Sequence, residues 1–120
     1  MNLTRGTIGD LVFLEGSPGH SFLKDASDMN TLLEECFAVP THSALLYAEN
    51  LPPAFFDVSS QQAGAMLQKL RNYGIRLAVV APPESVSTSR RFTELAAAER
   101  RDHMFGLFDS RAAALAWLAE

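Results

Sequence analysis

Hydrophobic residues form short runs along this chain, and their spacing alternates between that of strands and that of helices. Ile75 to Ala81 is predicted to be a strand, because it is rich in β-branched residues, follows Gly74 and precedes Pro82-Pro83. Ser43 to Glu49 is predicted to be a second strand, and its nearly continuous apolar character is typical of an interior strand in a parallel sheet.

The segment between these two strands predicts a helix with one apolar face. Ser59 and Gln62 have the spacing of a capping box, in which each side chain binds a backbone N–H at the start of the helix. Gly74 is predicted to end the helix as a left-handed C-cap. The apolar face consists of Ala63, Met66, Leu67 and Leu70.

An earlier helix is predicted before the first of these strands. Asp25 or Ser27 provides its N-cap, and Pro40 ends it. Its apolar side is predicted to consist of Leu32, Leu33, Cys36 and Phe37.

The C-terminal third predicts a helix, a strand and a final helix. The first helix spans Ser87 to Arg101, and the strand spans His103 to Phe108 with Gly106 marking a bulge or a close backbone approach. Asp109 or Ser110 caps the final helix. The inward-facing residues of the two helices are Phe92, Leu95, Ala96, Leu115 and Leu118, with Trp117 at the edge of the final helix.

The N-terminal region, residues 1–24, is predicted to form an antiparallel hairpin. Its strands are Leu11 to Leu14 and Ser21 to Leu23, joined by turn residues from Gly16 to Gly19. Because strands alternate with helices from residue 43 to residue 119, that part is a βαβαβα unit with parallel strands. The fold class is therefore α/β: one domain over 1–120, a mixed sheet with an N-terminal antiparallel hairpin, and about four helices covering it.

Composition narrows the class of protein. A chain of 120 residues with 48% hydrophobic and 20% charged residues is expected to form one globular domain. No apolar run approaches the roughly 20 residues of a membrane span, and no signal-peptide pattern is present, so we expect no membrane partner. A formal charge of −4 argues against nucleic-acid binding. The single cysteine, Cys36, fits a cytoplasmic location.

The usual patterns of catalytic and metal sites are missing. His20, His42 and His103 fall on separate predicted elements without the short spacing of zinc ligands. Cys36 is predicted to be a core residue, because no cationic neighbour in sequence would stabilise its thiolate. Ala81-Pro82-Pro83 lacks the N–H groups of a phosphate loop. We therefore predict no cofactor and no metal, and an enzymatic activity, though uncertain, is not favoured.

The stretch from Ala44 to Leu118 resembles the bacterial family called domain of unknown function 4180. The resemblance is carried by Phe55-Phe56-Asp57, Ala63-Gly64, Leu67-Gln68-Lys69, Asn72-Tyr73, Leu77-Ala78-Val79-Val80 and the closing Ala114, Trp117 and Leu118. More distantly, the order of elements is similar to that of STAS domains, the sulfate-transporter and anti-sigma-factor-antagonist fold. That similarity implies a STAS-like fold in which Ser59 or Ser60 is a phosphorylation switch read by a partner kinase.

The turn before the central helix is the preferred binding or regulatory site. A phosphate on its serines would add negative charge at the positive end of a helix, whereas the structural alternative is an N-cap. The adjacent phenylalanines are not expected both to point inward, so one is exposed at the mouth of the turn, or else loop irregularity buries both. The site comprises Phe55, Phe56, Asp57, Ser59, Ser60 and Gln61.

Three functions remain open. The preferred one is a non-enzymatic regulatory or interaction module of unknown pathway, which binds a protein partner through the Phe55 to Ser60 turn and the following helix. The second is a small-ligand-binding domain or an unrecognised enzyme with a pocket at the carboxyl ends of the parallel strands. The third is a homodimeric structural subunit that uses Phe55, Phe56 or Trp117. The pocket of the second would include Glu49, Asn50, Asp57 and Glu84.

Overall fold

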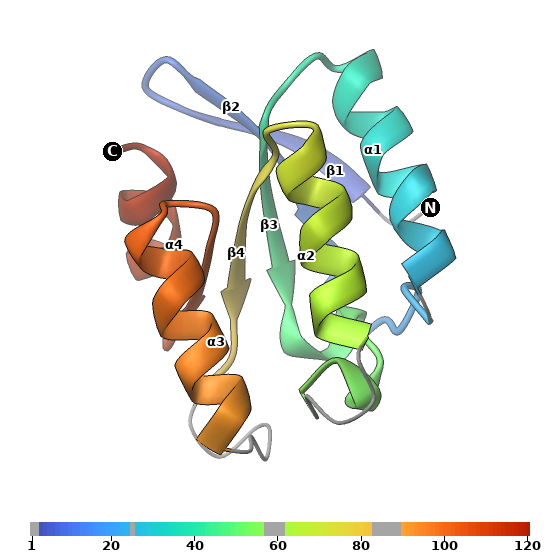
Figure 1. Cartoon of the computed structure of the whole chain (residues 1–120). Coiled ribbons are helices and arrows are strands. Elements are labelled where there is room, and N and C mark those ends of the chain that lie inside the picture. Colours follow the sequence, from blue (N-terminus) through green and yellow to red (C-terminus); the bar gives the residue numbers. More distant parts are fainter. Residues whose placement is uncertain (1–2, 25, 57–61, 83–89) are drawn as a thin grey trace.

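The computed structural model describes residues 3–24, 26–56, 62–82 and 90–120, and these ranges form one five-stranded sheet and four α-helices (Figure 1). The strands follow the order β1-β2-β3-β4-β5. Their bounds are β1 Leu3–Ile8, β2 Leu11–Gly16, β3 Ser43–Tyr47, β4 Arg76–Val80 and β5 Phe105–Phe108. Because β1 is antiparallel to β2 and the other neighbours are parallel, the predicted mixed α/β sheet is confirmed.

The helices cover both faces of the sheet. Helices α1, α2 and α3 contribute to one hydrophobic cluster on one face, and α4 contributes to a second cluster on the other. Their bounds are α1 Met29–Ala38, α2 Gln62–Asn72, α3 Arg90–Arg101 and α4 Arg111–Leu118. Short 3₁₀ helices span η1 Ala26–Asp28, η2 Ala48–Asn50 and η3 Pro53–Phe56.

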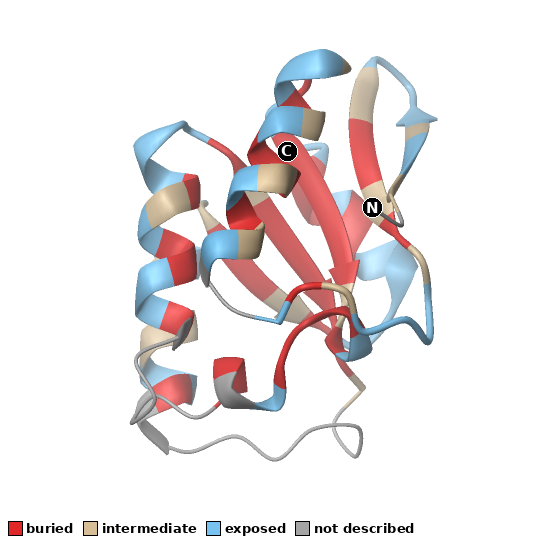
Figure 2. Ribbon diagram, turned by 90° about the vertical axis from the view of Figure 1, so that its right-hand side faces the viewer, coloured by how far each residue is buried: buried red, intermediate tan, exposed pale blue. Residues whose placement is uncertain are grey.

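Alternation along the central strands explains why both faces need a cover. In β4, Leu77 and Val79 join the cluster under α1 to α3, whereas Ala78 and Val80 join the cluster under α4. Figure 2 shows the central strands buried almost throughout, with the inner sides of the helices buried and their outer sides exposed. This arrangement accounts for the nearly continuous apolar runs in the sequence.

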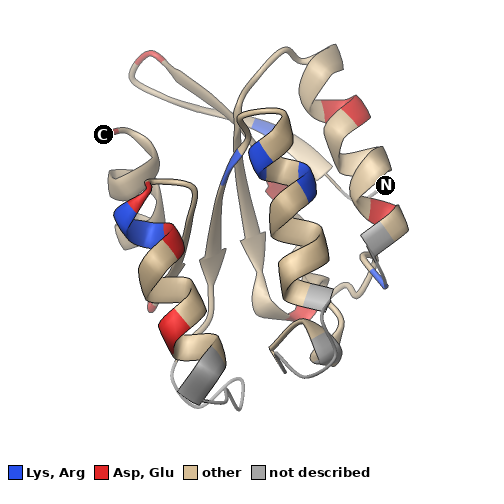
Figure 3. Ribbon diagram, viewed as in Figure 1, with Lys and Arg blue, Asp and Glu red and all other residues tan. Residues whose placement is uncertain are grey.

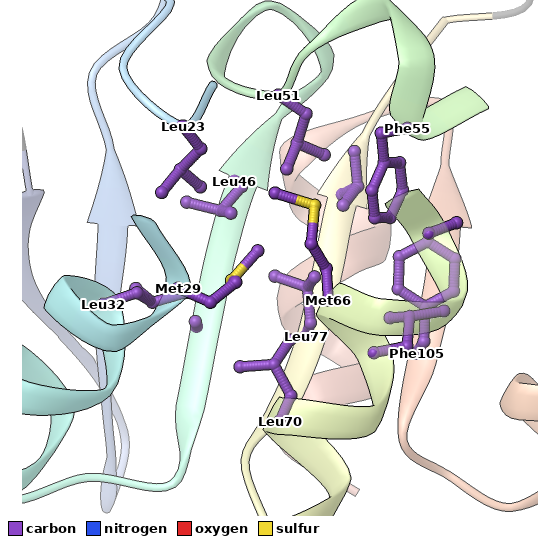
Figure 4. Packing of buried hydrophobic residues seen from close by; sticks show 14 of the residues in the cluster. Leu23, Met29, Leu32, Leu46, Leu51, Phe55, Met66, Leu70, Leu77 and Phe105 are labelled. Carbon is purple, nitrogen blue, oxygen red and sulfur yellow. The ribbon is translucent and has the colours of Figure 1, made fainter. Parts of the chain in front are cut away.

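The larger cluster joins α1 and α2 to the sheet. Met29 of α1 and Met66 of α2 lie over Leu46 and Leu77 in the close-up of Figure 4, and all four side chains are buried. At roughly 1.5–3 kcal/mol for each buried large apolar side chain, this face stabilises the fold more than any single cap does.

The hairpin forms, but with a different partner strand from the one predicted. β2 pairs with β1 upstream, across a turn at Gly9-Asp10, and Ser21 to Leu23 is not a strand. Gly9 has φ 57°, which suits the first position of a two-residue hairpin turn. Leu23 instead donates its backbone N–H to Asn50 O and buries its side chain in the core.

The predicted helix ends are largely confirmed. Gly74 has φ 67° and follows α2, while Ile75 N donates to Leu70 O as in a Schellman cap. Ser110 Oγ accepts the backbone N–H of Ala113 and caps α4. The cap predicted for α1 at Asp25 lies outside the described residues. Ser27 lies within η1, and the residue before α1 is Asp28, whose side chain makes no cap hydrogen bond.

Two aromatic side chains lie opposite to their predicted places. Phe37 is 51% exposed, because it follows the buried Cys36 by one residue and therefore points about 100° around the helix from it. Trp117 was predicted at the edge of the last helix, but it is buried in the α4 cluster against Phe108. Within the described ranges, no helix is long and apolar enough to cross a membrane.

Candidate functional site

Phe55 and Phe56 are both part of the core, so of the two predicted alternatives the burial of both rings is confirmed and the exposure of one is not. Their exposed fractions are 0% and 4%, and their rings meet edge to face with centroids 5.2 Å apart. Phe55 also contacts the rings of Phe92 and Phe105, at 5.7 Å and 5.9 Å between centroids. The 3₁₀ turn η3 directs the two adjacent rings into one aromatic cluster, which an extended strand would not allow. Neither ring forms a docking surface for a partner or a second copy.

The remaining residues of the predicted turn, Asp57, Ser59, Ser60 and Gln61, lie outside the described residues, as does Glu84 of the predicted pocket. The capping box predicted for Ser59 and Gln62 falls in the same gap, although α2 itself begins at Gln62.

Asn50 of the predicted pocket is buried and fully hydrogen-bonded. Its Oδ1 accepts the backbone N–H of Tyr47 at 2.8 Å, while its Nδ2 donates to Ser17 O and His20 O at 2.7 Å and 2.8 Å. Glu49 Oε1 accepts the backbone N–H of Gly19 at 2.9 Å. Both side chains therefore hold the loop after β2 against η2, and both donor positions of the Asn50 amide are already used.

A polar cluster that the sequence did not reveal lies at the carboxyl end of the sheet. Arg111, the first residue of α4, donates from Nε to Glu15 Oε2 at 2.8 Å and from Nη2 to Glu15 Oε1 at 3.0 Å. Tyr47 Oη donates to the same Oε2 of Glu15 at 2.5 Å. We call Glu15, Tyr47 and Arg111 the carboxylate cluster. It links the N-terminal hairpin, β3 and α4 through charge-assisted hydrogen bonds.

The acid–base properties of the carboxylate cluster follow from these contacts. The hydrogen bonds from Arg111 lower the pKa of Glu15, and the Tyr47 hydroxyl lowers it further while burial acts in the opposite direction. Burial and the neighbouring carboxylate raise the pKa of Tyr47 to about 12. At neutral pH the cluster therefore contains a carboxylate, a guanidinium and a neutral phenol, none of which is poised for proton transfer.

An exposed aromatic pair lies at the opposite end of the molecule, where α1 and α2 finish. Phe37 and Tyr73 are 51% and 54% exposed, and their rings contact edge to face with centroids 5.5 Å apart. Among the side chains that the structure describes, only one other large hydrophobic residue, Ile8, is exposed. We call Phe37 and Tyr73 the aromatic pair.

Charged residues around the aromatic pair are separated by helix. In Figure 3, α1 carries acidic residues only, whereas the C-terminal half of α2 carries basic ones. Lys69 donates to Asn30 Oδ1 at 3.2 Å, which joins the two helices below the pair. Arg71 forms ion pairs with Glu99 and Asp102 and so joins α2 to α3.

The family model described as a domain of unknown function (DUF4180) matches residues 10–118. The chain belongs to the DUF4180 family. Neither the curated proteins nor the solved structures gave a match. The region matched by the DUF4180 model contains the carboxylate cluster and the aromatic pair, whereas all of β1 lies before it.

Other chemistry in this DUF4180 chain is limited by burial. Cys36 is fully buried, and burial followed by the charge of Glu35 raises the pKa of its thiol to about 11, so it is the predicted core residue. A thiol with such a pKa is a poor nucleophile at neutral pH. Among the described residues, no group of three or more His, Cys, Asp or Glu side chains is arranged to hold a metal ion.

Proposed function

We propose that this chain is a non-enzymatic regulatory or interaction module whose protein partner binds the outer faces of α1 and α2. The observation that carries the proposal is the aromatic pair, in which two large rings contact each other while each stays more than half exposed. Aromatic residues are enriched at interfaces, because they bury a large area at a low entropic cost. The proposal keeps α2, the helix after the Phe55 to Ser60 turn, as part of the binding surface. It places the partner at the C-terminal end of α2 instead of at the turn.

Polar neighbours of the aromatic pair suit a specific contact. Gln68 and Asn72 are exposed on α2 and hydrogen-bond to each other, with Gln68 Nε2 donating to Asn72 Oδ1 at 2.8 Å. Glu34 is exposed one turn before Phe37 on α1. An apolar centre with a polar rim is the usual composition of a transient protein interface.

Affinity capture with matched variants tests this function. The chain serves as bait in a lysate of the organism that encodes it, beside Phe37→Ser, Tyr73→Ser and the control Arg101→Ser, which changes an exposed side chain at the end of α3. We expect the recovery of a protein captured by wild type and Arg101→Ser to fall at least about tenfold with either aromatic variant, which corresponds to 1.4 kcal/mol or more. Equal recovery with all four baits would contradict the proposal.

The regulatory part of the proposal rests on the similarity to STAS domains. On this proposal the chain has a STAS-like fold, and a phosphate on Ser59 or Ser60 changes how the partner binds. The chain works in the cytoplasm, where its single thiol stays reduced. Baits with Ser59→Asp or Ser60→Asp are expected to change the recovery of the partner relative to Ser59→Ala and Ser60→Ala. Identical recovery would remove the switch while leaving the interaction itself intact.

The small-ligand alternative is favoured by the position of the carboxylate cluster. Glu15, Tyr47 and Arg111 lie at the carboxyl ends of strands, where open α/β sheets usually bind ligands. The half-exposed guanidinium of Arg111 suits an anionic metabolite. A thermal-shift screen of carboxylates and nucleotides tests this: a ligand at 100 times its Kd adds about 2.7 kcal/mol to stability. Such a shift should disappear in Arg111→Met, and the absence of any shift would favour the interaction module.

A further inference from the structure

We infer that the outer edge of β1 pairs with β1 of a second copy of this chain, so that the two sheets continue into one across a two-fold axis. β1 is the edge strand in the described sheet and has β2 as its neighbour. Its six residues pair without interruption from Leu3 opposite Gly16 to Ile8 opposite Leu11. An unbroken edge strand of this length offers a row of backbone groups to another strand.

β1 lacks the features that usually block pairing at a sheet edge. It contains no proline or lysine, its register has no bulge, and Arg5 is its one charged residue. Thr4, Arg5, Thr7 and Ile8 are exposed. At the other edge, β5 has four residues, which is a shorter template.

The hairpin also projects from the body of the molecule, which leaves room for a second copy. β2 pairs with β3 in parallel through Leu14 and Glu15, so the part of the hairpin near Gly9 extends past Ser43, the first residue of β3. Figure 1 shows this hairpin reaching away from the helices. Backbone groups on its outer side are therefore accessible.

Hairpin geometry identifies the backbone groups that face outward. In a two-residue hairpin, the closing pair, here Ile8 and Leu11, exchanges both backbone hydrogen bonds. Hydrogen-bonding direction alternates along a strand, so Thr4, Gly6 and Ile8 bond toward β2. Leu3, Arg5 and Thr7 then present their N–H and C=O groups to the outer edge.

Within Leu3–Ile8, the symmetric registers centred on Arg5 and on Gly6 pair the most residues, and charge distinguishes between these two. A two-fold axis perpendicular to the sheet keeps each face on the same side, so opposed residues must both be odd-numbered or both even-numbered. Centring the axis on Arg5 would oppose two guanidinium groups, which is unfavourable. Centring it on Gly6 opposes Arg5 to Thr7 of the second copy, and both residues bond outward. In this register Thr4 lies beside Ile8 of the second copy, and a threonine–isoleucine pair is favourable in sheets.

A proline on the outer edge tests the interface without removing a hydrogen bond to β2. Thr7→Pro deletes an N–H that faces outward, and proline is tolerated at such positions on edge strands. Light scattering over a dilution series should give twice the chain mass of 13.1 kDa for wild type and the single-chain mass for Thr7→Pro. A wild-type protein that is monomeric throughout, including one that binds an extended peptide instead, would overturn the inference.

Cross-linking tests the register and does not depend on the proline variant. In the proposed pair, Thr4 and Ile8 of the second copy form a non-hydrogen-bonded pair with Cα atoms about 4.5 Å apart, which a disulfide spans. Thr4→Cys/Ile8→Cys, in a Cys36→Ala background, should oxidise to a covalent dimer. Thr4→Cys alone should not, because the two copies of residue 4 would be roughly 13 Å apart. A dimer that cross-links equally with the single variant, or that survives Thr7→Pro, would place the interface elsewhere.

Discussion

The guanidinium of Arg76 lies 4.4 Å from the centroid of the Trp117 ring, so a side chain of β4 stacks on the indole of α4. The same guanidinium donates from Nη2 to Trp117 O at 3.1 Å and from Nη1 to Leu118 O at 3.0 Å. Its Nε donates to His103 O at 2.9 Å. Because the last carbonyls of a helix have no intrahelical partner, Arg76 completes the C-terminus of α4 and joins it to the turn before β5.

Replacing Arg76 by lysine should therefore destabilise the fold although it keeps the charge. A single ammonium group cannot reproduce a planar fork that serves three carbonyl groups and stacks on a ring. We expect Arg76→Lys to lower the free energy of unfolding by about 1–2 kcal/mol and Arg76→Ala by about 2–4 kcal/mol. Urea denaturation measures both values. Arg101→Lys, at an exposed site at the end of α3, is the control and should change little.

Removing the Asn50 amide should release the loop that follows β2. Asn50→Ala removes the amide hydrogen bonds to Ser17 O and His20 O and the acceptor of the Tyr47 N–H, and it should cost about 2–3 kcal/mol. Gly16→Ala should disturb the same network, because a Cβ at residue 16 would overlap Asn50 Oδ1. Since both changes act on one network, the double variant should cost clearly less than the sum of the single ones.

Gly64→Ala is the control for the comparison of Asn50→Ala, Gly16→Ala and their double variant. A Cβ at residue 64 would meet no atom within 4 Å, and the residue lies within a helix. This substitution should raise stability by about 0.5–1 kcal/mol. Strict additivity of Asn50→Ala and Gly16→Ala in chemical denaturation would show that they do not share a network.

Elements that depend on local pattern were predictable from the sequence. β3 and β4 have the apolar character of interior strands, Gly74 and Ser110 end and begin helices through their own backbone or side-chain chemistry, and Gly106 was expected at a close approach. A Cβ on Gly106 would indeed lie 2.7 Å from Phe108 Cε2. These features involve residues a few positions apart.

Features that depend on distant residues were not predictable in this way. Glu15 and Arg111 are 96 positions apart, and nothing local in the sequence of either indicates the pairing. The burial of both Phe55 and Phe56 depends on Phe92 and Phe105, which come from a later helix and strand. Phe37 is exposed because it follows the buried Cys36 by one residue, and apolar spacing alone defines the edge of a buried helix face only to within one residue.

Truncating Phe55 should behave as a core substitution. Its ring is fully buried among Phe56, Phe92 and Phe105, so Phe55→Ala should create a cavity and cost about 3–5 kcal/mol. Phe55→Leu, which keeps most of the apolar volume, should cost distinctly less. Thermal and urea unfolding measure both variants. A Phe55→Ala protein as stable as wild type, but defective in partner capture, would restore Phe55 as a binding residue.

Cys36 should make the protein less stable at alkaline pH. Its thiol has a pKa of about 11 in the folded chain against 9.0 for a solvent-exposed thiol, so the unfolded chain loses this proton first. Stability is therefore complete below about pH 9 and falls as the pH rises toward 11. The unfolding free energy of Cys36→Ala should therefore fall less steeply with rising pH than that of wild type. Adding Tyr47→Phe to Cys36→Ala should make the fall shallower still, because the pKa of Tyr47 is also raised. Equal slopes for wild type and Cys36→Ala would contradict the assignment.

The ion pair of Glu15 and Arg111 should make the protein less stable at acid pH. The pKa of Glu15 is lowered in the folded chain, mainly by hydrogen bonds from Arg111, so the unfolded chain binds a proton more readily as the pH falls. The stabilisation is present above the unfolded value of 4.5 and is lost as the pH falls through the folded value. Arg111→Met should reduce stability at neutral pH by about 1 kcal/mol, since the pair is partly solvated.

The acid dependence separates the ion pair from the packing of Arg111. Denaturation midpoints measured between neutral pH and the acid limit of folding should converge for wild type and Arg111→Met, because protonated Glu15 no longer attracts the guanidinium. A constant gap between the two proteins at every pH would assign the effect of Arg111 to its contact with the Phe13 ring, whose centroid lies 5.9 Å away. Tyr47→Phe should keep most of the pH dependence, since the phenol makes the smaller contribution to lowering the pKa of Glu15.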